Sequence, residues 1–88
     1  MVNYQIFFTK QAQKDSEKIK KNNLKSKVEK LLKILEIDPY KNPPRYEKLV
    51  GDLKGSYSRR INIQHRLIYQ VYDKEKIVKV LRMWTHYE

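Results

Sequence analysis

The sequence predicts an α+β domain in which an N-terminal helical hairpin packs on one face of a curved, mainly antiparallel sheet, in the order βααβββ. Two patterns carry this prediction: apolar residues recur at helical spacing in the first half of the chain and alternate with polar residues in the second. The length of 88 residues suits one hydrophobic core. We therefore expect residues 1–88 to form a single domain.

The first half of the chain is expected to form one strand and two helices. Residues 2–8 are β-branched and aromatic, as in a strand, and Thr9 is suited to cap a helix that follows. Asn23 is expected to cap the second helix, which ends at Asp38 because the residue before a proline disfavours helical geometry. The apolar stripe of that helix consists of Leu24, Val28, Leu31, Leu32 and Leu35.

The second half of the chain changes to a period of two. Residues 39–52 form a loop with three prolines, with a short strand expected around residues 46–50. Two alternating strands follow. In the first, Tyr57, Arg59, Ile61 and Ile63 point one way and Ser58, Arg60 and Asn62 the other; in the second, Leu67, Tyr69 and Val71 alternate with Arg66, Ile68, Gln70 and Tyr72. The last strand should run from Ile77 to about Tyr87, and its apolar start is typical of a central strand.

Composition excludes several classes of protein. The chain has no cysteine and two histidines, so disulfides and a structural metal are not expected, and no cofactor is implied. No apolar run approaches the ~20 residues that span a bilayer, and no signal-peptide pattern opens the chain. We therefore expect neither a membrane protein nor a secreted disulfide-bonded one.

The charge indicates a polyanionic partner. The net charge is +10, and all five arginines lie in residues 41–88, whereas residues 1–40 carry lysine as their only basic residue. Arginine presents a planar fork that suits phosphate, and lysine is a solvated point charge. The second half is thus expected to handle phosphate, and the lysine-rich first helix is either a solvated surface or a contact with structural RNA.

The sheet face left open by the helices is the expected position of the chemistry. Arg82, Trp84 and His86 share one side of the last strand, and Arg66 projects from its neighbour to the same face. Glu47 is expected at the edge of this face, and Arg60 near one end of its own strand, on the side away from Ile61. An acid, a histidine and several arginines on one surface are the groups that cleavage of a phosphodiester requires.

The expected reaction uses the 2′-hydroxyl of RNA as the nucleophile. Glu47 is the candidate base, His86 the candidate acid and Arg66 the cation that stabilises the phosphorane. Tyr87, Trp84 and Tyr57 are candidates to stack on or orient bases. The route needs no metal, and DNA would be inert because it lacks the 2′-hydroxyl. Singly, each residue also has a structural interpretation: Glu47 a screened ion pair, Trp84 sheet packing and His65 stabilisation of the turn before Arg66.

Three segments together resemble the YoeB/Txe toxins, which belong to the RelE/ParE superfamily of type II toxin–antitoxin modules. These segments are Tyr57-Ser58-Arg59-Arg60-Ile61, His65-Arg66-Leu67-Ile68-Tyr69 and Trp84-Thr85-His86-Tyr87, preceded by Glu47 in Tyr46-Glu47-Lys48-Leu49. The resemblance spans essentially the whole chain and implies the RelE-like fold.

The resemblance also implies an activity, that of a cytoplasmic, ribosome-dependent mRNA endoribonuclease that cuts the codon in the ribosomal A site and halts translation. It implies that Glu47, Arg66, His86 and Tyr87 are catalytic and that Arg60 contacts phosphate. Arg59, Tyr57 and Trp84 are the further candidates for RNA contact. Many members of the family have a lysine where this chain has Val50, so that phosphate contact is either lost or supplied by Lys48 or Lys54. Glu88, after the usual terminal tyrosine, is a second departure.

The implied partners are the ribosome, with its rRNA and mRNA, and a cognate antitoxin that covers the basic face. Homodimers are common in the family. Two alternatives remain open: a ParE-like poison of a protein such as gyrase, a class that generally lacks the Glu/His/Tyr set, and a non-catalytic RNA-binding module.

Overall fold

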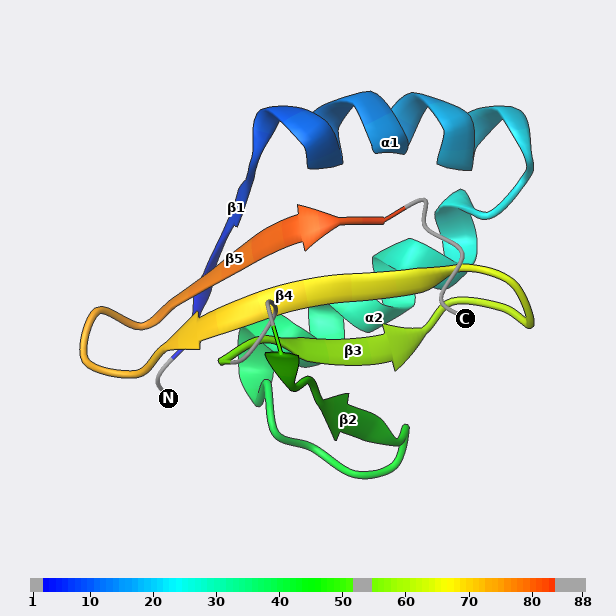
Figure 1. The fold of residues 1–88 in the computed structure, drawn as a ribbon. Coiled ribbons are helices and arrows are strands. Elements are labelled where there is room, and N and C mark those ends of the chain that lie inside the picture. Colours follow the sequence, from blue (N-terminus) through cyan, green and yellow to red (C-terminus); the bar gives the residue numbers. More distant parts are fainter. Residues whose placement is uncertain (1–2, 52–54, 84–88) are drawn as a thin grey trace.

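The computed structural model describes residues 3–51 and 55–83, which form two helices and a five-stranded sheet (Figure 1). The elements are β1 (Gln5–Phe8), α1 (Lys10–Lys21), α2 (Lys25–Ile37), β2 (Tyr46–Lys48), β3 (Tyr57–Arg60), β4 (Arg66–Tyr72) and β5 (Ile77–Arg82). The strand order is β1-β5-β4-β3-β2, in which β1 and β5 are parallel and the other neighbours antiparallel. The predicted α+β class and mainly antiparallel sheet are confirmed.

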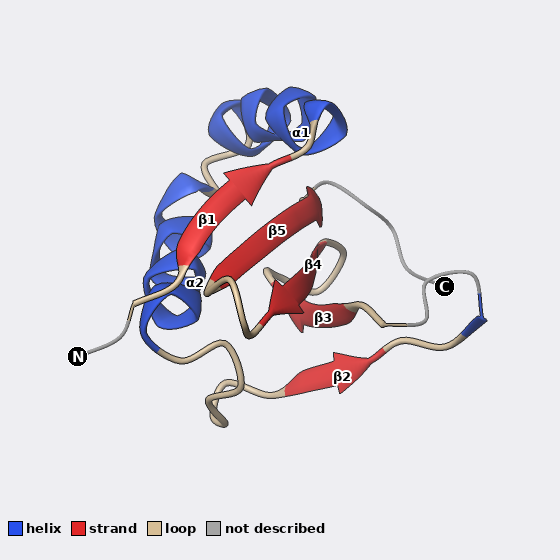
Figure 2. Ribbon diagram, turned by 90° about the vertical axis from the view of Figure 1, so that its left-hand side faces the viewer, coloured by secondary structure: helices blue, strands red, loops and turns tan. Residues whose placement is uncertain are grey.

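Both helices lie on the same side of the curved sheet, and they cross rather than run strictly antiparallel (Figure 2). The predicted central strand is β5, which lies between β1 and β4. Strand β5 ends at Arg82 in the described part of the chain, and the predicted continuation over residues 84–87 lies outside it. Strand β3 is shorter than expected: Ile63, predicted to continue it, lies in the following turn and is 87% exposed.

The ends of the first helix follow from two short motifs. Thr9 caps α1 as predicted, because its Oγ1 accepts a hydrogen bond from the backbone N–H of Ala12 at 3.1 Å. Asn23 does not cap α2, contrary to expectation: it adopts a positive φ of 58° after α1. The N–H of Asn23 donates to the carbonyl of Lys20 and that of Leu24 to Ile19, which is the Schellman pattern. The prediction failed because asparagine suits both a helix start and a left-handed helix end.

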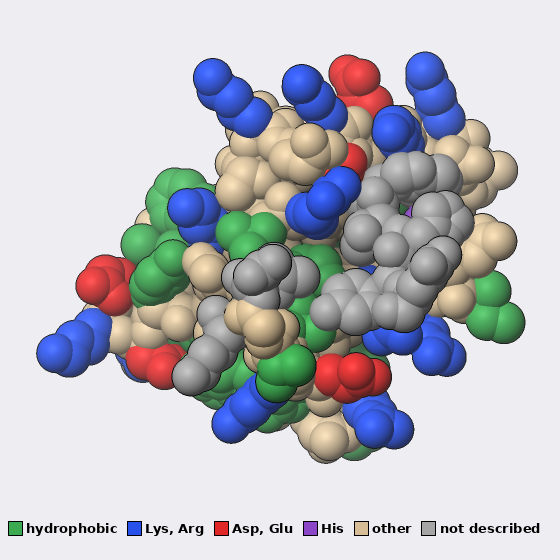
Figure 3. All heavy atoms as spheres, in the orientation of Figure 1, with side chains coloured by type: hydrophobic (Ala, Val, Ile, Leu, Met, Phe, Trp, Pro, Cys, Tyr) green, Lys and Arg blue, Asp and Glu red, His purple; other side chains and the backbone are tan. Residues whose placement is uncertain are grey.

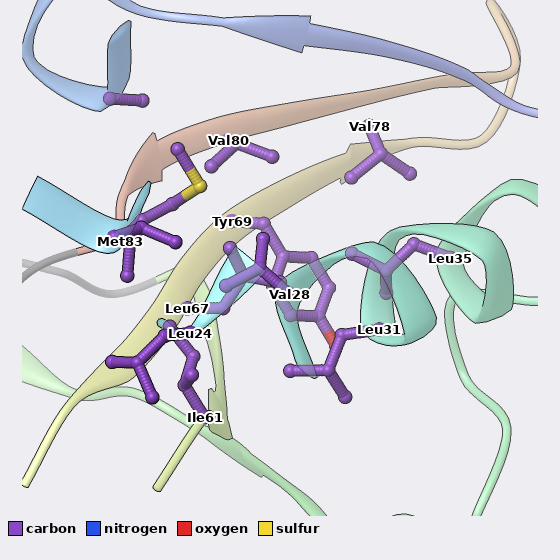
Figure 4. Packing of buried hydrophobic residues seen from close by; sticks show 12 residues of the cluster. Leu24, Val28, Leu31, Leu35, Ile61, Leu67, Tyr69, Val78, Val80 and Met83 are labelled. Atoms are coloured by element: carbon purple, nitrogen blue, oxygen red, sulfur yellow. The ribbon is translucent and has the colours of Figure 1, made fainter. Parts of the chain in front are cut away.

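The core lies between the helices and the sheet (Figure 4). The α2 stripe supplies four buried side chains as predicted, and Leu32 packs against their edge. The sheet supplies Ile61, Leu67, Tyr69, Val78, Val80 and Met83. These positions fix which face of each strand turns toward the helices and, by alternation, which face stays open.

A buried carboxylate ties α1 to the end of β5. Asp15 is 1% exposed; its Oδ2 accepts a hydrogen bond from the backbone N–H of Met83 at 3.0 Å, and its Oδ1 accepts from Gln11 at 2.9 Å. Near the start of the same helix, Thr9 Oγ1 donates to the carbonyl of Leu81 at 2.8 Å. The helix therefore fixes the backbone of residues 81–83.

Replacing Asp15 by alanine is expected to destabilise the protein by about 2 kcal/mol, because the amide of Met83 loses a charged acceptor in a buried position. The measurement is urea unfolding at neutral pH. Glu17→Ala is the matched control, since it removes a carboxylate from an exposed position of the same helix and should change stability by less than about 0.5 kcal/mol. Equal effects of the two substitutions would contradict the anchoring role.

Candidate active site

The open face of the sheet brings together polar side chains from three neighbouring strands. Glu47 of β2 lies directly opposite Ser58 of β3, and Arg60 of β3 lies directly opposite Arg66 of β4. Residues two apart on a strand share a face, so all four side chains lie on the face away from the helices. The predicted convergence of Glu47, Arg60 and Arg66 is therefore present in the structure.

Glu47 and Arg66 are in direct electrostatic contact. Arg66 Nη1 and Glu47 Oε1 are 3.7 Å apart, and the two side chains are 20% and 50% exposed, respectively. A partly exposed pair of this kind adds little to folding stability. The pair places a carboxylate beside a guanidinium at the surface, where both groups could contact one phosphate.

The same side chains surround a hollow of about 240 Å³. It is lined by Pro44, Arg45, Glu47, Ser58, Arg60 and Arg66, so three of the five arginines of the chain meet around one carboxylate. On the face that Figure 3 shows, basic and acidic side chains stand together over β2 and β3. The excess of guanidinium groups gives this hollow the character of an anion site.

Two features of the hollow would favour a bound anion. Arg60 and Arg66 are directly opposite one another on adjacent antiparallel strands, and like charges in that position repel. Ser58 is 1% exposed, and its Oγ has no hydrogen-bond partner among the described residues. A bound phosphate would relieve the repulsion between the two guanidinium groups, which is the behaviour expected of a binding site.

Arg59 does not contact solvent, and the expectation that it binds RNA is corrected. It is 0% exposed. Its Nε donates to the Tyr69 hydroxyl at 2.9 Å, its Nη1 to the carbonyl of Pro44 at 2.6 Å, and its Nη2 to the carbonyls of Pro39 and Lys41 at 3.0 and 2.9 Å. Burial raises the pKa of Tyr69, and the nearby guanidinium partly offsets that rise. Arg59 is thus an internal clamp for the proline-rich loop.

Tyr57 and Lys48 were also predicted to contact RNA at this site, and neither side chain lies on the open face. Tyr57 shares the helix-side face of β3 with Arg59, and its ring packs against the rings of Tyr40, Tyr46 and Tyr69 at centroid distances of 5.7–5.8 Å. Lys48 lies opposite Tyr57 in the sheet, so alternation places it on the other face of β2 from Glu47. Neither residue lines the hollow. Their predicted contacts with RNA at this site are corrected accordingly.

Several predicted site residues lie outside the described residues: Lys54, Trp84, His86 and Tyr87. Glu88, the departure after the usual terminal tyrosine, lies outside them too. Val50, in place of the expected lysine, is 82% exposed and does not line the hollow. His65 is 3% exposed in the turn before Arg66, where its N–H donates to Asn62 Oδ1 at 2.7 Å, which agrees with its interpretation as a turn residue.

Arg45 and Ser58 are members of the hollow that the sequence prediction missed. The available signal was alternation: Arg45 is two residues before Glu47 and Ser58 two before Arg60. Among residues 3–51 and 55–83, acidic and histidine side chains form no cluster of three that would hold a metal ion. Neither described helix has the length and apolarity needed to cross a membrane.

Together, the fold and the hollow define a small basic α+β domain with a carboxylate–arginine pocket. The family model of the YoeB-like toxin of bacterial type II toxin–antitoxin systems matches residues 8–87. The toxin YoeB of Synechocystis is 34% identical over 76 residues, which are 86% of this chain and 79% of that toxin. The toxin RelK of Mycobacterium tuberculosis is 36% identical over 61 residues, 69% of each chain.

Solved structures agree with the sequence relatives. The YoeB–YefM toxin–antitoxin heterotetramer from Staphylococcus aureus contains a chain with a TM-score of 0.81 and 34% identity, covering 98% of this chain and 100% of that one. The YoeB dimer from the same organism gives a TM-score of 0.82 with the same identity and coverage. The YoeB/ParE toxin from Agrobacterium tumefaciens gives 0.85 at 26% identity, covering 94% of this chain and 99% of that one. The chain belongs to the YoeB toxin family of type II toxin–antitoxin systems.

Proposed function

We propose that this toxin is a metal-independent endoribonuclease that cleaves mRNA in the A site of the ribosome and thereby inhibits translation. The observation that carries the proposal is the pair formed by Glu47 and Arg66, 3.7 Å apart in a hollow lined by two further arginines. Membership of the YoeB family supports it. A general base and a cation beside one bound phosphate are the groups that attack by a 2′-hydroxyl requires.

In the proposed reaction, Glu47 removes the proton of the 2′-hydroxyl as its oxygen attacks the adjacent phosphorus. The new O2′–P bond forms while the P–O5′ bond breaks, which leaves a 2′,3′-cyclic phosphate. His86 donates a proton to the departing 5′-oxygen, and Tyr87 helps to orient the reacting groups. Arg66 and Arg60 stabilise the extra negative charge of the phosphorane.

The proposed ribosome dependence agrees with the distribution of charge. The net charge of +10 exceeds what one codon would neutralise, and basic side chains stand along α1, away from the hollow (Figure 3). Lys10, Lys14, Lys18 and Lys21 of this helix are all exposed. We assign them to rRNA, which would hold the open face of the sheet toward the mRNA.

We further propose that a cognate antitoxin neutralises this toxin by covering the hollow. The supporting observation is that three arginines line one hollow and would attract an acidic segment. The relative from Staphylococcus aureus forms a complex with YefM and also a dimer. Because that relative forms a dimer, we propose a homodimer of this chain as well. We also propose that residues 1–88 form one independently folding toxin domain, since the relative's chain covers 98% of this one.

Mapping of RNA ends on translating ribosomes tests the proposed function. Adding the purified toxin is expected to produce new mRNA ends within the A-site codon, and the same mRNA without ribosomes should be cut far more slowly. Intact mRNA together with inhibited DNA supercoiling would instead support the ParE-like alternative.

A further inference from the structure

We propose that Arg45 binds a backbone phosphate of the RNA next to the cleaved linkage. The substrate assignment rests on the proposed function, whereas the binding role rests on the position of Arg45 in the hollow. Arg45 lines the hollow together with Glu47, Arg60 and Arg66, and its side chain is exposed. It is therefore accessible to a ligand that already contacts the catalytic pair.

The strand register explains why Arg45, and not another nearby cation, takes this position. Arg45 directly precedes β2 and shares a face with Glu47, whereas Tyr46 and Lys48 point to the opposite face. The guanidinium carbon of Arg59 lies 5.0 Å from the ring centroid of Tyr46. Because Arg59 is buried, this contact shows that the face of β2 carrying Tyr46 turns toward the interior. Lys48 is thus excluded from the hollow by the same alternation that directs Arg45 into it.

The backbone leading to Arg45 is held in place by the buried guanidinium of Arg59. Three carbonyls of the proline-rich loop accept hydrogen bonds from Arg59, and the last of them belongs to Pro44, the residue before Arg45. Pro44 itself lines the hollow. A side chain on an anchored backbone loses less entropy when it binds, so Arg45 is preorganised for an anion.

The charge count of the hollow leaves room for a second phosphate. Glu47 lies beside Arg66 and offsets its charge. The positive charges of Arg45 and Arg60 remain without a carboxylate in the lining of the hollow. The cleaved linkage needs Arg66, with Arg60 opposite it, to stabilise its extra charge. Arg45 lines the hollow on the side of the proline-rich loop and β2. We place the neighbouring phosphate of the RNA on that side.

The test compares two single substitutions that each remove one positive charge on either side of Glu47. Arg45→Gln removes the proposed contact, and Lys48→Gln is the matched control on the other face. Binding of a single-stranded RNA with 2′-O-methyl groups, which this reaction cannot cleave, is measured by fluorescence anisotropy over a series of potassium chloride concentrations. Thermal melting of each variant verifies its fold.

Arg45→Gln is expected to reduce the slope of log binding constant against log salt by about 0.7, the value for one phosphate contact to a single strand. Its affinity at low salt should fall about 3- to 10-fold. Lys48→Gln should leave the slope unchanged, and Arg45→Lys should keep most of it. An unchanged slope for Arg45→Gln, or an equal loss for Lys48→Gln, would overturn the proposal.

The outcome also separates this inference from the proposed function. If the parent toxin cleaves mRNA on ribosomes but Arg45→Gln keeps the full salt slope, the Arg45 contact alone is wrong. If the parent neither cleaves mRNA nor binds RNA in a salt-dependent way, both the function and the contact are wrong.

Discussion

Replacing Arg66 by alanine is expected to lower the rate of mRNA cleavage by at least ~100-fold. Removal of one group that stabilises the charge of a transition state typically costs a factor of about 10²–10³. Arg66 is well placed for that role, because its side chain is 20% exposed in the wall of the hollow and lies 3.7 Å from the proposed base. The measurement is the single-turnover rate on stalled ribosomal complexes.

Companion variants separate the chemical role of Arg66 from a general loss of charge. Arg66→Lys should recover only part of the rate, because lysine lacks the planar fork of arginine. Glu47→Gln preserves shape and should cost ~10²–10⁴-fold by removing the base. Lys74→Ala, in the exposed β4–β5 turn, is the charge control and should retain the parent rate. Full activity of Arg66→Ala or Glu47→Gln would refute the assigned roles.

Replacing the buried Arg59 by methionine is expected to destabilise the protein by about 3–5 kcal/mol. The substitution leaves the carbonyls of Lys41 and Pro44 without their donor, and the carbonyl of Pro39 keeps only the Tyr69 hydroxyl. Unpaired buried polar groups cost about 1–3 kcal/mol each. Partial opening of the loop to water would keep the total below the sum. Urea unfolding, followed by circular dichroism, measures the change in the free energy of unfolding.

The adjacent residue provides a matched control for Arg59. Arg60 is exposed on the open face, and Arg60→Met removes the same charge and leaves a side chain of the same kind. Its effect on stability should be within about 0.5 kcal/mol, or favourable, because the repulsion with Arg66 disappears. A stable Arg59→Met and an unstable Arg60→Met would mean that the faces of β3 are the reverse of those described.

The fold followed from the sequence because its main signals are strong and repeated. The stripe of α2 and the apolar first half of β5 each have one buried arrangement, and the short β2 was indicated by its position after the prolines. Asn23 was misassigned because its two local roles are not distinguished by residue type. Asp15 gave no signal at all, since its partner is a backbone amide 68 residues away.

The candidate site was predictable in its carboxylate and the arginine paired with it, and less so in its other contacts. Glu47 and Arg66 meet as expected, because alternation and strand order place them on the same open face. The burial of Arg59 was missed because arginine is almost never fully buried. Its position two residues before Ile61, on the same face of the strand, indicated the core side. Lys48 was a candidate because it lies near the position of the missing lysine, whereas the register of β2 places it on the other face from Glu47.

Cleavage of an mRNA that carries one 2′-deoxynucleotide tests most directly whether the hollow promotes attack by the 2′-hydroxyl. The substitution is made on the 5′ side of the cut mapped on ribosomes, and it changes neither the codon nor the phosphate. We predict that cleavage at this linkage stops while the toxin still binds the complex. Cleavage at the parent rate would show that another nucleophile attacks the phosphorus and would contradict the roles given to Glu47 and Arg66.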